Sequence, residues 1–237
     1  MSMLLAFLAA AAAAPLPDNA STPLPQQIHA LVSEDADCIV KNEHDAASGA
    51  ILSNATDAEL VRSYPQLVRE TCVPMRLGDY IRVGLTPTQM RDAIAEALVR
   101  RDLSAVAPPV LDDVPGLSHW RVGEPPATDS AGRPLTGRKA EEMMTEYQQA
   151  QLVAYLSRYG ECVVRVDPAA AKALLMTDEG TPAESAAFGN MSTALGTCVA
   201  EGRSLNFNKS SLRGSIAVNY YRLAAAARAE EHTSAGK

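Results

Sequence analysis

The chain has 237 residues, a formal net charge of −7 and few aromatic residues, and much of its hydrophobic content is alanine. This length allows one large domain or two small ones, and alanine-rich sequence favours helices. Because no cluster of Lys and Arg occurs in this acidic chain, it is a poor candidate for binding nucleic acid or anionic membranes.

Residues 1–20 are predicted to be a signal peptide. Residues 4–14 form an uninterrupted apolar run that ends in small residues before Pro15, which is typical of a secretory signal and too short to span a bilayer. No positive segment precedes the run, and a buried N-terminal helix is the alternative. We expect an exported protein, periplasmic or secreted, with no integral membrane segment after signal removal.

A first helical module is predicted over residues 21–103. An apolar stripe with helical spacing predicts its first helix, which ends at Asn42 or Glu43. Pro65 is expected to kink or divide the third helix, and Thr86, which precedes a proline, has the pattern of an N-cap. The helices are predicted at residues 28–41, 45–52, 57–71 and 87–101.

Residues 104–138 are predicted to be a linker, because they hold six prolines and four glycines and show no helical or strand periodicity. A structureless connection of this length is either functional or mobile. It contains the only tryptophan, Trp120. We expect Trp120 to fasten the linker to a hydrophobic seam, and an exposed ligand or partner contact is the alternative.

The second module, residues 139–229, carries stronger helix signals. Its long first helix has an apolar stripe from Met144 to Val163, in which Gly160 is the weak point. Asp167 precedes a proline and is the predicted N-cap of the next helix.

The later helices of this module also have recognisable starts. Thr181 is a predicted N-cap, and Glu184 completes the pattern of a capping box. Asn208 or Ser210 is expected to open the last helix, and residues 230–237 are predicted to be a flexible tail.

The two halves repeat one pattern. The stretch 159–165 has a degraded copy at 35–41, each containing a cysteine, and apolar residues upstream keep the same separation. Such a long period points to two copies of one module. We therefore predict an all-α protein of two tandem, pseudo-symmetric modules. A small β-hairpin in each module, at residues 73–85 and 199–207, is the alternative and would add minor β structure.

The four cysteines form two equivalent pairs. Their spacing of about 35 residues within each pair is far from that of zinc ribbons or of a redox Cys-x-x-Cys. An even count in an exported protein indicates structural disulfides. Because a module had to be stable before it was doubled, we predict the pairs Cys38–Cys72 and Cys162–Cys198.

The sequence holds no local catalytic motif. A phosphate-binding loop, the nucleophile elbow of α/β-hydrolases and a His-Glu-x-x-His helix are absent, although a serine triad is assembled in space and needs no local motif. General-base candidates are sparse, since the histidines outside the tail are His29, His44 and His119. The cluster 43–45 is interpreted as a solvated helix start rather than as metal ligands. We expect no cofactor and no metal ion.

A few side chains are candidates for ligand contact. Arg91 and Arg213 stand at equivalent positions of the repeat, where each is expected to pair with a local carboxylate or to cover apolar surface, with an anionic ligand as the alternative. Tyr220 belongs to a group of tyrosines expected to pack in the core, with an aromatic pocket as the alternative. Trp120, Arg213 and Tyr220 are therefore the possible ligand or partner contacts, and no catalytic residue is assigned.

The second module carries a recognisable combination of motifs: the stretch 159–165, Asp167-Pro168-Ala169-Ala170, Cys198 and Leu212-Arg213-Gly214. This combination resembles a group of exported alphaproteobacterial proteins with a duplicated two-cysteine helical module. The first copy departs from it where His44 replaces the proline. The resemblance implies no activity, cofactor or catalytic residue.

For function, we expect an exported, non-enzymatic binding or envelope-associated protein whose ligand, a protein or a small molecule, is unknown. The grounds are the missing catalytic motifs and a linker that could present an extended recognition segment. The alternative is a hydrolase or another small-molecule enzyme with its site between the modules. Its candidate residues are Arg213, Glu161 and Tyr220, and a closed pocket with a carboxylate of perturbed pKa would favour it.

Overall fold

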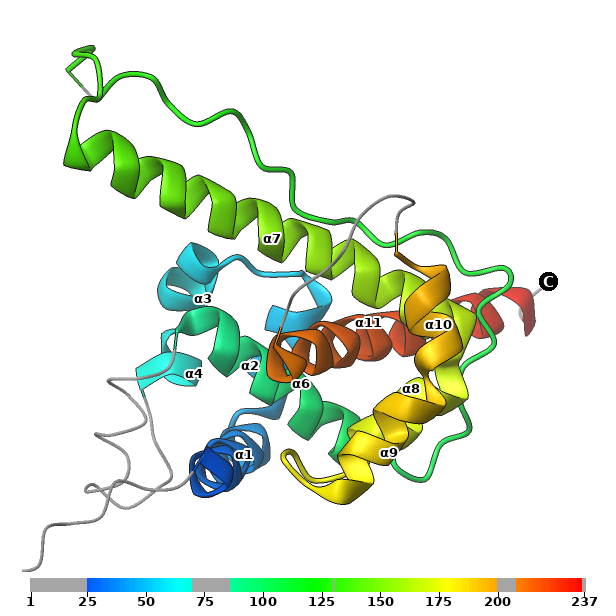
Figure 1. Cartoon of the computed structure of the whole chain (residues 1–237). Helices are drawn as coiled ribbons and strands as arrows, with labels where there is room; N and C mark the ends of the chain where they lie inside the picture. The colour runs from blue at the N-terminus through cyan, green and yellow to red at the C-terminus, as the bar shows by residue number, and fades with distance from the viewer. Residues whose placement is uncertain (1–24, 70–85, 130, 200–207, 236–237) are drawn as a thin grey trace, which may run out of the picture.

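The computed structural model describes residues 25–69, 86–129, 131–199 and 208–235, and these residues form helices joined by loops (Figure 1). Apart from one isolated bridge between Thr128 and Pro134, they contain no strand. The all-α prediction is therefore confirmed for this part of the chain. The alternative hairpins lie outside the described residues, except for Val199.

The helices of the first half are α1 (Pro25–Asn42), α2 (His44–Leu52), α3 (Asp57–Ser63), α4 (Pro65–Arg69) and α6 (Pro87–Leu103). Those of the second half are α7 (Arg138–Val166), α8 (Pro168–Leu175), α9 (Pro182–Asn190), α10 (Ser192–Thr197) and α11 (Lys209–Ala235). Helix α11 continues into the stretch predicted as a tail. None of the described helices is long and apolar enough to cross a membrane.

Most predicted helix starts are present. Thr86 caps α6 in a complete capping box with Gln89, and Asp167 caps α8 by accepting the Ala170 N–H at 2.8 Å. Pro65 divides the predicted third helix into α3 and α4, because its ring cannot continue a helix without a break. Local capping patterns therefore place these boundaries correctly.

The capping box predicted at Thr181 is only half formed, which corrects the sequence analysis. Thr181 Oγ1 accepts the N–H of Glu184 at 3.2 Å, but the Glu184 carboxylate accepts from the Gly180 N–H at 3.0 Å and pairs with Arg213 Nη1 at 3.2 Å. A buried guanidinium attracts this carboxylate more strongly than the neutral backbone N–H of Thr181 at the helix start.

Helix α11 is central to the packing. It lies against α6 on one side and α7 on the other, while α1 packs on the far side of α6 (Figure 1). The buried apolar side chains of both halves form a single cluster that includes Leu98, Val163, Ile216 and Leu223. The described residues of the two halves therefore share one hydrophobic core.

Two glycines allow the close helix contacts. A Cβ at Gly160 of α7 would lie 2.4 Å from Ser215 Oγ, and one at Gly214 of α11 would lie 2.4 Å from the Cβ of Asp92. Both distances are impossible for real side chains, so α11 can approach α6 and α7 this closely only with glycine at these positions. Gly160, expected to weaken α7, is thus a packing contact within an unbroken helix.

The predicted linker is fastened along α7 and α8 (Figure 1). Arg165 donates to the carbonyl oxygens of three linker residues, Leu111 at 3.3 Å, Val114 at 3.0 Å and Pro115 at 2.7 Å. Lys172 Nζ donates to the carbonyl oxygen of Ser104 at 2.8 Å, and Trp120 Nε1 donates to that of Asn54 at 2.7 Å. The linker is therefore a strap, and the Trp120 hydrogen bond holds it to the turn that follows α2.

One predicted disulfide is present. Cys162 of α7 and Cys198 after α10 are joined with an S–S distance of 2.06 Å. The second predicted pair cannot be compared, because Cys72 lies outside the described residues, and Cys38–Cys72 stays a prediction. The predicted signal peptide lies outside them as well.

Candidate ligand pocket and polar cluster

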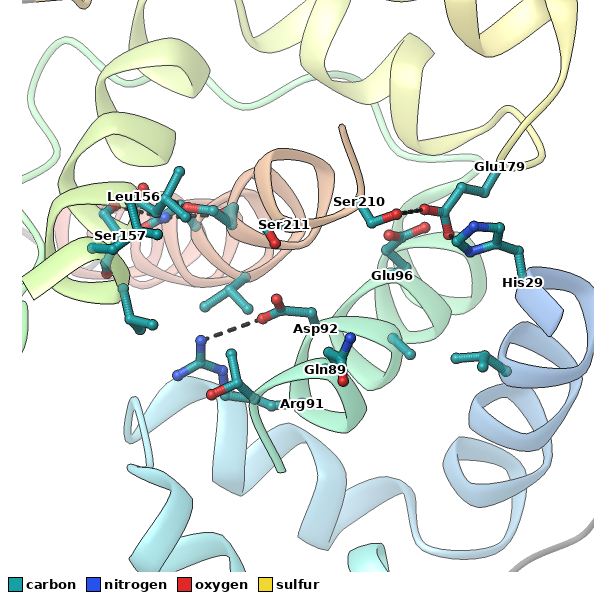
Figure 2. Close-up of a pocket in the computed structure, with 18 of the residues that line it drawn as sticks. His29, Gln89, Arg91, Asp92, Glu96, Leu156, Ser157, Glu179, Ser210 and Ser211 are labelled. Carbon is teal, nitrogen blue, oxygen red and sulfur yellow. Dashed lines mark hydrogen bonds and ion pairs between the residues drawn. The ribbon is translucent and has the colours of Figure 1, made fainter. Parts of the chain in front are cut away.

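A pocket of about 590 Å³ lies between α1, α6, α7 and α11 (Figure 2). One part of its wall is apolar and includes Ile28, Val32, Leu152, Leu156 and Val218. The polar part includes Arg91, Asp92, Ser157, Ser215 and Asn219. A mostly apolar cavity with a few converging polar groups is typical of small-molecule sites.

Arg91 is the principal charged group of this wall. It is 5% exposed, its Nη2 donates to Asp92 Oδ1 at 3.3 Å, and its guanidinium carbon lies 4.3 Å from the ring centroid of Trp120. Its Nε and Nη1 have no hydrogen-bond partner. The stacking on Trp120 compensates part of the charge burial, but Nε and Nη1 stay buried without an acceptor.

Asp92 is the carboxylate nearest to Arg91 (Figure 2). Burial raises its pKa to about 6, although the charge and hydrogen bond of Arg91 act in the opposite direction. A carboxyl group of this kind changes its protonation close to neutral pH. The pair therefore places one positive charge and one titratable acid on the same wall.

The other acidic residues of the pocket already have partners. Glu96 Oε2 accepts from Arg213 Nε at 2.8 Å, and burial raises the pKa of Glu96. Glu179 pairs with His29 Nδ1 at 3.0 Å and accepts from the Ser210 hydroxyl. These groups, seen at the right of Figure 2, are less available to a ligand than Arg91.

Arg213, a candidate contact, is completely buried and engages every nitrogen of its guanidinium group. Besides Glu96, it contacts the Glu184 carboxylate at 3.2 Å, the Leu174 carbonyl at 3.0 Å and the Thr177 carbonyl at 2.6 Å. It ties α11 to α6 and to the ends of α8 and α9. The sequence led us to expect a local carboxylate, but both partners come from other helices. No donor nitrogen of Arg213 is left for a ligand.

The other two candidates differ in their position. Tyr220 is 1% exposed within the shared core, where burial raises its pKa to about 12. Trp120 is partly buried, and its ring stacks on the guanidinium of Arg91. Of the three predicted contacts, only Trp120 touches Arg91, the residue of the pocket wall that has unpaired donor nitrogens.

A hydrogen-bonded chain of three side chains lies at one end of the pocket. The Ser157 hydroxyl lies 2.8 Å from His119 Nδ1, and His119 Nε2 lies 2.5 Å from Glu161 Oε2. Ser157 lines the pocket and is 8% exposed. Ser157 and Glu161 are one helical turn apart on α7, so both can face the same imidazole, while His119 comes from the strap.

Glu161 is held in its ionised form. Burial alone would raise its pKa, but hydrogen bonds lower the pKa to about 2. The donors are His119, the Leu117 N–H at 3.0 Å and Arg165 Nε at 2.7 Å. An ionised carboxylate accepts the Nε2–H of His119, which leaves Nδ1 free to accept the Ser157 hydroxyl proton when the imidazole is neutral.

Asn219 and Arg222 of α11 complete the polar cluster. Asn219 Nδ2 donates to the Ser157 carbonyl at 2.9 Å, while its Oδ1 is buried without a partner. Arg222 Nη2 donates to the Ser118 carbonyl at 2.9 Å, and its Nε and Nη1 are also unpaired. Burial lowers the pKa of Arg222. Buried polar atoms are usually hydrogen-bonded, so these atoms call for a partner such as bound water, an ion or a ligand.

Sequence reasoning named His119 as a possible base and Glu161 as a candidate but missed Ser157, Asp92 and Asn219. The available signal was the i, i+4 spacing of Ser157 and Glu161, which is too common on helices to be specific. Among the described residues, no group of three metal-ligating side chains occurs. His44 instead contacts Asp102, with 2.9 Å between His44 Nε2 and Oδ2, and this hydrogen bond raises the pKa of His44.

No family model, curated protein or solved structure matches this chain.

Proposed function

We propose that the chain is an exported protein that binds a small amphipathic ligand in the pocket between α1, α6, α7 and α11. The observation that carries this proposal is Arg91, a buried guanidinium on the wall of an otherwise largely apolar cavity, with two nitrogens that lack acceptors. Leaving buried donors unpaired costs about 1–3 kcal/mol each. A ligand that supplies acceptor oxygens would recover part of that free energy.

The ligand class follows from the two walls of the pocket. An aliphatic body fits the side formed by residues such as Ile28, Val32 and Leu152, and its burial contributes about 25 cal/mol per Å². The head group should be an oxyanion or another strong acceptor, because Arg91 offers a positive charge and unpaired N–H donors. A cationic head group would be repelled by Arg91.

The proposal also includes export to an oxidising compartment and a chain built of two similar modules. The Cys162–Cys198 disulfide supports an oxidising compartment. The order of one long helix, several short ones and a second long one occurs in each half, which supports two pseudo-symmetric modules. Peptide mapping without reduction tests the remaining pair: a peptide linking Cys38 to Cys72 is expected, and free thiols or a link between Cys38 and Cys162 would contradict it.

The binding test compares three probes with the same chain and different head groups: decane-1-sulfonate, decan-1-ol and decyltrimethylammonium, each below its micelle concentration. Affinities are measured by calorimetry, with fluorescence of the single tryptophan, Trp120, as a second readout because it stacks on Arg91. We expect the sulfonate to bind most tightly and Arg91→Gln to weaken it at least tenfold. Arg158→Gln, an exposed arginine of α7, is the matched control.

The pH dependence of sulfonate binding is a further part of this test. Asp92 has a pKa of about 6, so lowering the pH from 7.5 to 5 neutralises a carboxylate that repels the anion and competes for Arg91. The charged groups facing Asp92 are Arg91 and, at longer range, Asp57. Glu96, Glu179 and His29 also line the cavity. Binding should therefore tighten as the pH falls. Equal affinity of all three probes, or no loss in Arg91→Gln, would overturn the proposal.

A further inference from the structure

We infer that Ser157 is a nucleophile, activated by His119 and oriented through Glu161, and that the pocket hydrolyses esters of apolar acids. This inference rests on the proposed ligand pocket, whose end Ser157 lines. The three side chains are joined by contacts of 2.8 Å and 2.5 Å. A nucleophile, a base in hydrogen-bond reach and a third group that orients the base are the components of a serine triad.

The surroundings of the triad favour catalysis over simple fastening of the strap. A serine in the middle of a helix commonly bonds its hydroxyl back to the carbonyl four residues earlier, whereas the Ser157 hydroxyl lies beside the imidazole of His119. Glu161 is itself oriented by Arg165 and the Leu117 N–H. Asn219 holds the Ser157 carbonyl. Glu161 and the Ser157 backbone are therefore each held by a contact from outside the triad, and His119 is held between them.

A base needs an unprotonated nitrogen that faces the nucleophile. The Glu161 carboxylate accepts the Nε2–H of His119, so Nδ1 is the acceptor in neutral imidazole. This orientation exchanges the two ring nitrogens relative to the usual serine triad, in which Nε2 faces the serine. The proton transfers are nevertheless the same as in the usual triad, because one ring nitrogen accepts from the serine while the other donates to a carboxylate.

The reaction balances with water as the only co-reactant. The Ser157 oxygen adds to the ester carbonyl carbon while its proton passes to His119 Nδ1. Collapse of the tetrahedral intermediate breaks the ester C–O bond, and the leaving alcohol takes that proton. Water then attacks the acyl-serine with His119 again as base, which releases the carboxylic acid and restores the hydroxyl.

The residues that line the pocket indicate the class of substrate. The acyl chain would occupy the apolar wall near Leu152 and Leu156. The negative charge that develops on the carbonyl oxygen requires donors, and Arg91 lines the same pocket with unpaired nitrogens while stacking on Trp120, the neighbour of His119 in the chain. The leaving alcohol should be small and neutral, because the remaining lining carboxylates would repel an anionic one.

The experiment treats the intact oxidised protein with an alkyl fluorophosphonate probe and maps the modified residue by mass spectrometry. We expect labelling at Ser157, no labelling in Ser157→Ala, and full labelling in Ser192→Ala, an exposed serine of α10. Hydrolysis of p-nitrophenyl hexanoate should fall at least a hundredfold in Ser157→Ala. In His119→Ala, labelling should fall at least tenfold and return with added imidazole, a rescue that a purely structural histidine would not show.

The outcomes separate this inference from the proposed function. Tight binding of decane-1-sulfonate without labelling of the wild-type protein at Ser157 would overturn the triad and leave the binding pocket intact. Labelling at Ser157 without sulfonate binding would support the triad and contradict the anionic ligand. Failure of both measurements would reject both proposals, and the wild-type labelling result does not depend on any variant folding correctly.

Discussion

Arg91 and Arg213 differ in the acceptors around them, although the predicted repeat places them at equivalent positions. Arg213 meets two carboxylates and the backbone carbonyls at the end of α8. Arg91 has one long contact to Asp92 and an aromatic ring that cannot accept all of its N–H groups. One guanidinium is therefore fully paired, whereas the other keeps two buried nitrogens without an acceptor, the observation on which the proposed ligand rests.

The Arg213→Ala variant should lose stability. Removal of this side chain leaves the Glu96 and Glu184 carboxylates buried without the guanidinium that pairs with both. Breaking a buried ion pair on one side costs about 3–5 kcal/mol. Urea unfolding measures the difference, and Arg158→Ala should change stability by less than about 0.5 kcal/mol. A similar small effect at Arg213 would contradict the structural role.

At the residue scale, the sequence predicted side chains whose partners are local. Thr86 and Asp167 cap helices because their acceptors lie three residues away from the N–H groups they bind. The chain of Ser157, His119 and Glu161 has no such signal, because 38 residues separate His119 from Ser157. Only the path of the strap brings them together, and no local pattern encodes that path.

The strap between α6 and α7 is the element that sequence reasoning described least well. Its lack of periodicity was read correctly from its prolines and glycines, and its extended path follows from them. Its attachment depends on single long side chains of other elements, Arg165 of α7 and Lys172 of α8. Trp120 fastens the strap through a hydrogen bond to the Asn54 carbonyl and through stacking on Arg91. These are polar contacts, whereas the expectation was a hydrophobic seam.

Arg165→Gln should loosen one part of the strap. The variant loses the donors to Leu111, Val114 and Pro115 and the contact with Glu161. We expect faster amide hydrogen exchange over residues 111–120, including the Leu117 N–H, and unchanged exchange in the middle of α11.

Lys172→Gln is the matched variant for this measurement, because Lys172 binds the strap only at Ser104 and Val106. It should affect residues 104–107 and leave Leu117 protected. Unchanged protection of Leu117 in Arg165→Gln would show that the strap is held by other contacts.

On the scale of the whole molecule, the helical class was predictable and the shared core was not. Alanine-rich, amphipathic stretches with clear caps predict helices, but they do not say which apolar faces meet. The contact of α6 with α11 is made by pairs far apart in sequence: Asp92 with Gly214, Glu96 with Arg213, and Asp102 with Tyr221 at 2.9 Å. These pairs join the two predicted modules.

Because α6 packs on α11, the first half should not fold alone. A fragment of residues 21–103 would expose the face of α6 that α11 covers and leave Glu96 without its main cationic partner. A module of this size buries little surface even with a disulfide. We expect the oxidised fragment to show helical circular dichroism without a cooperative urea transition, while the full chain unfolds cooperatively. A sharp transition in the fragment would instead show an autonomous module and place the boundary near residue 103.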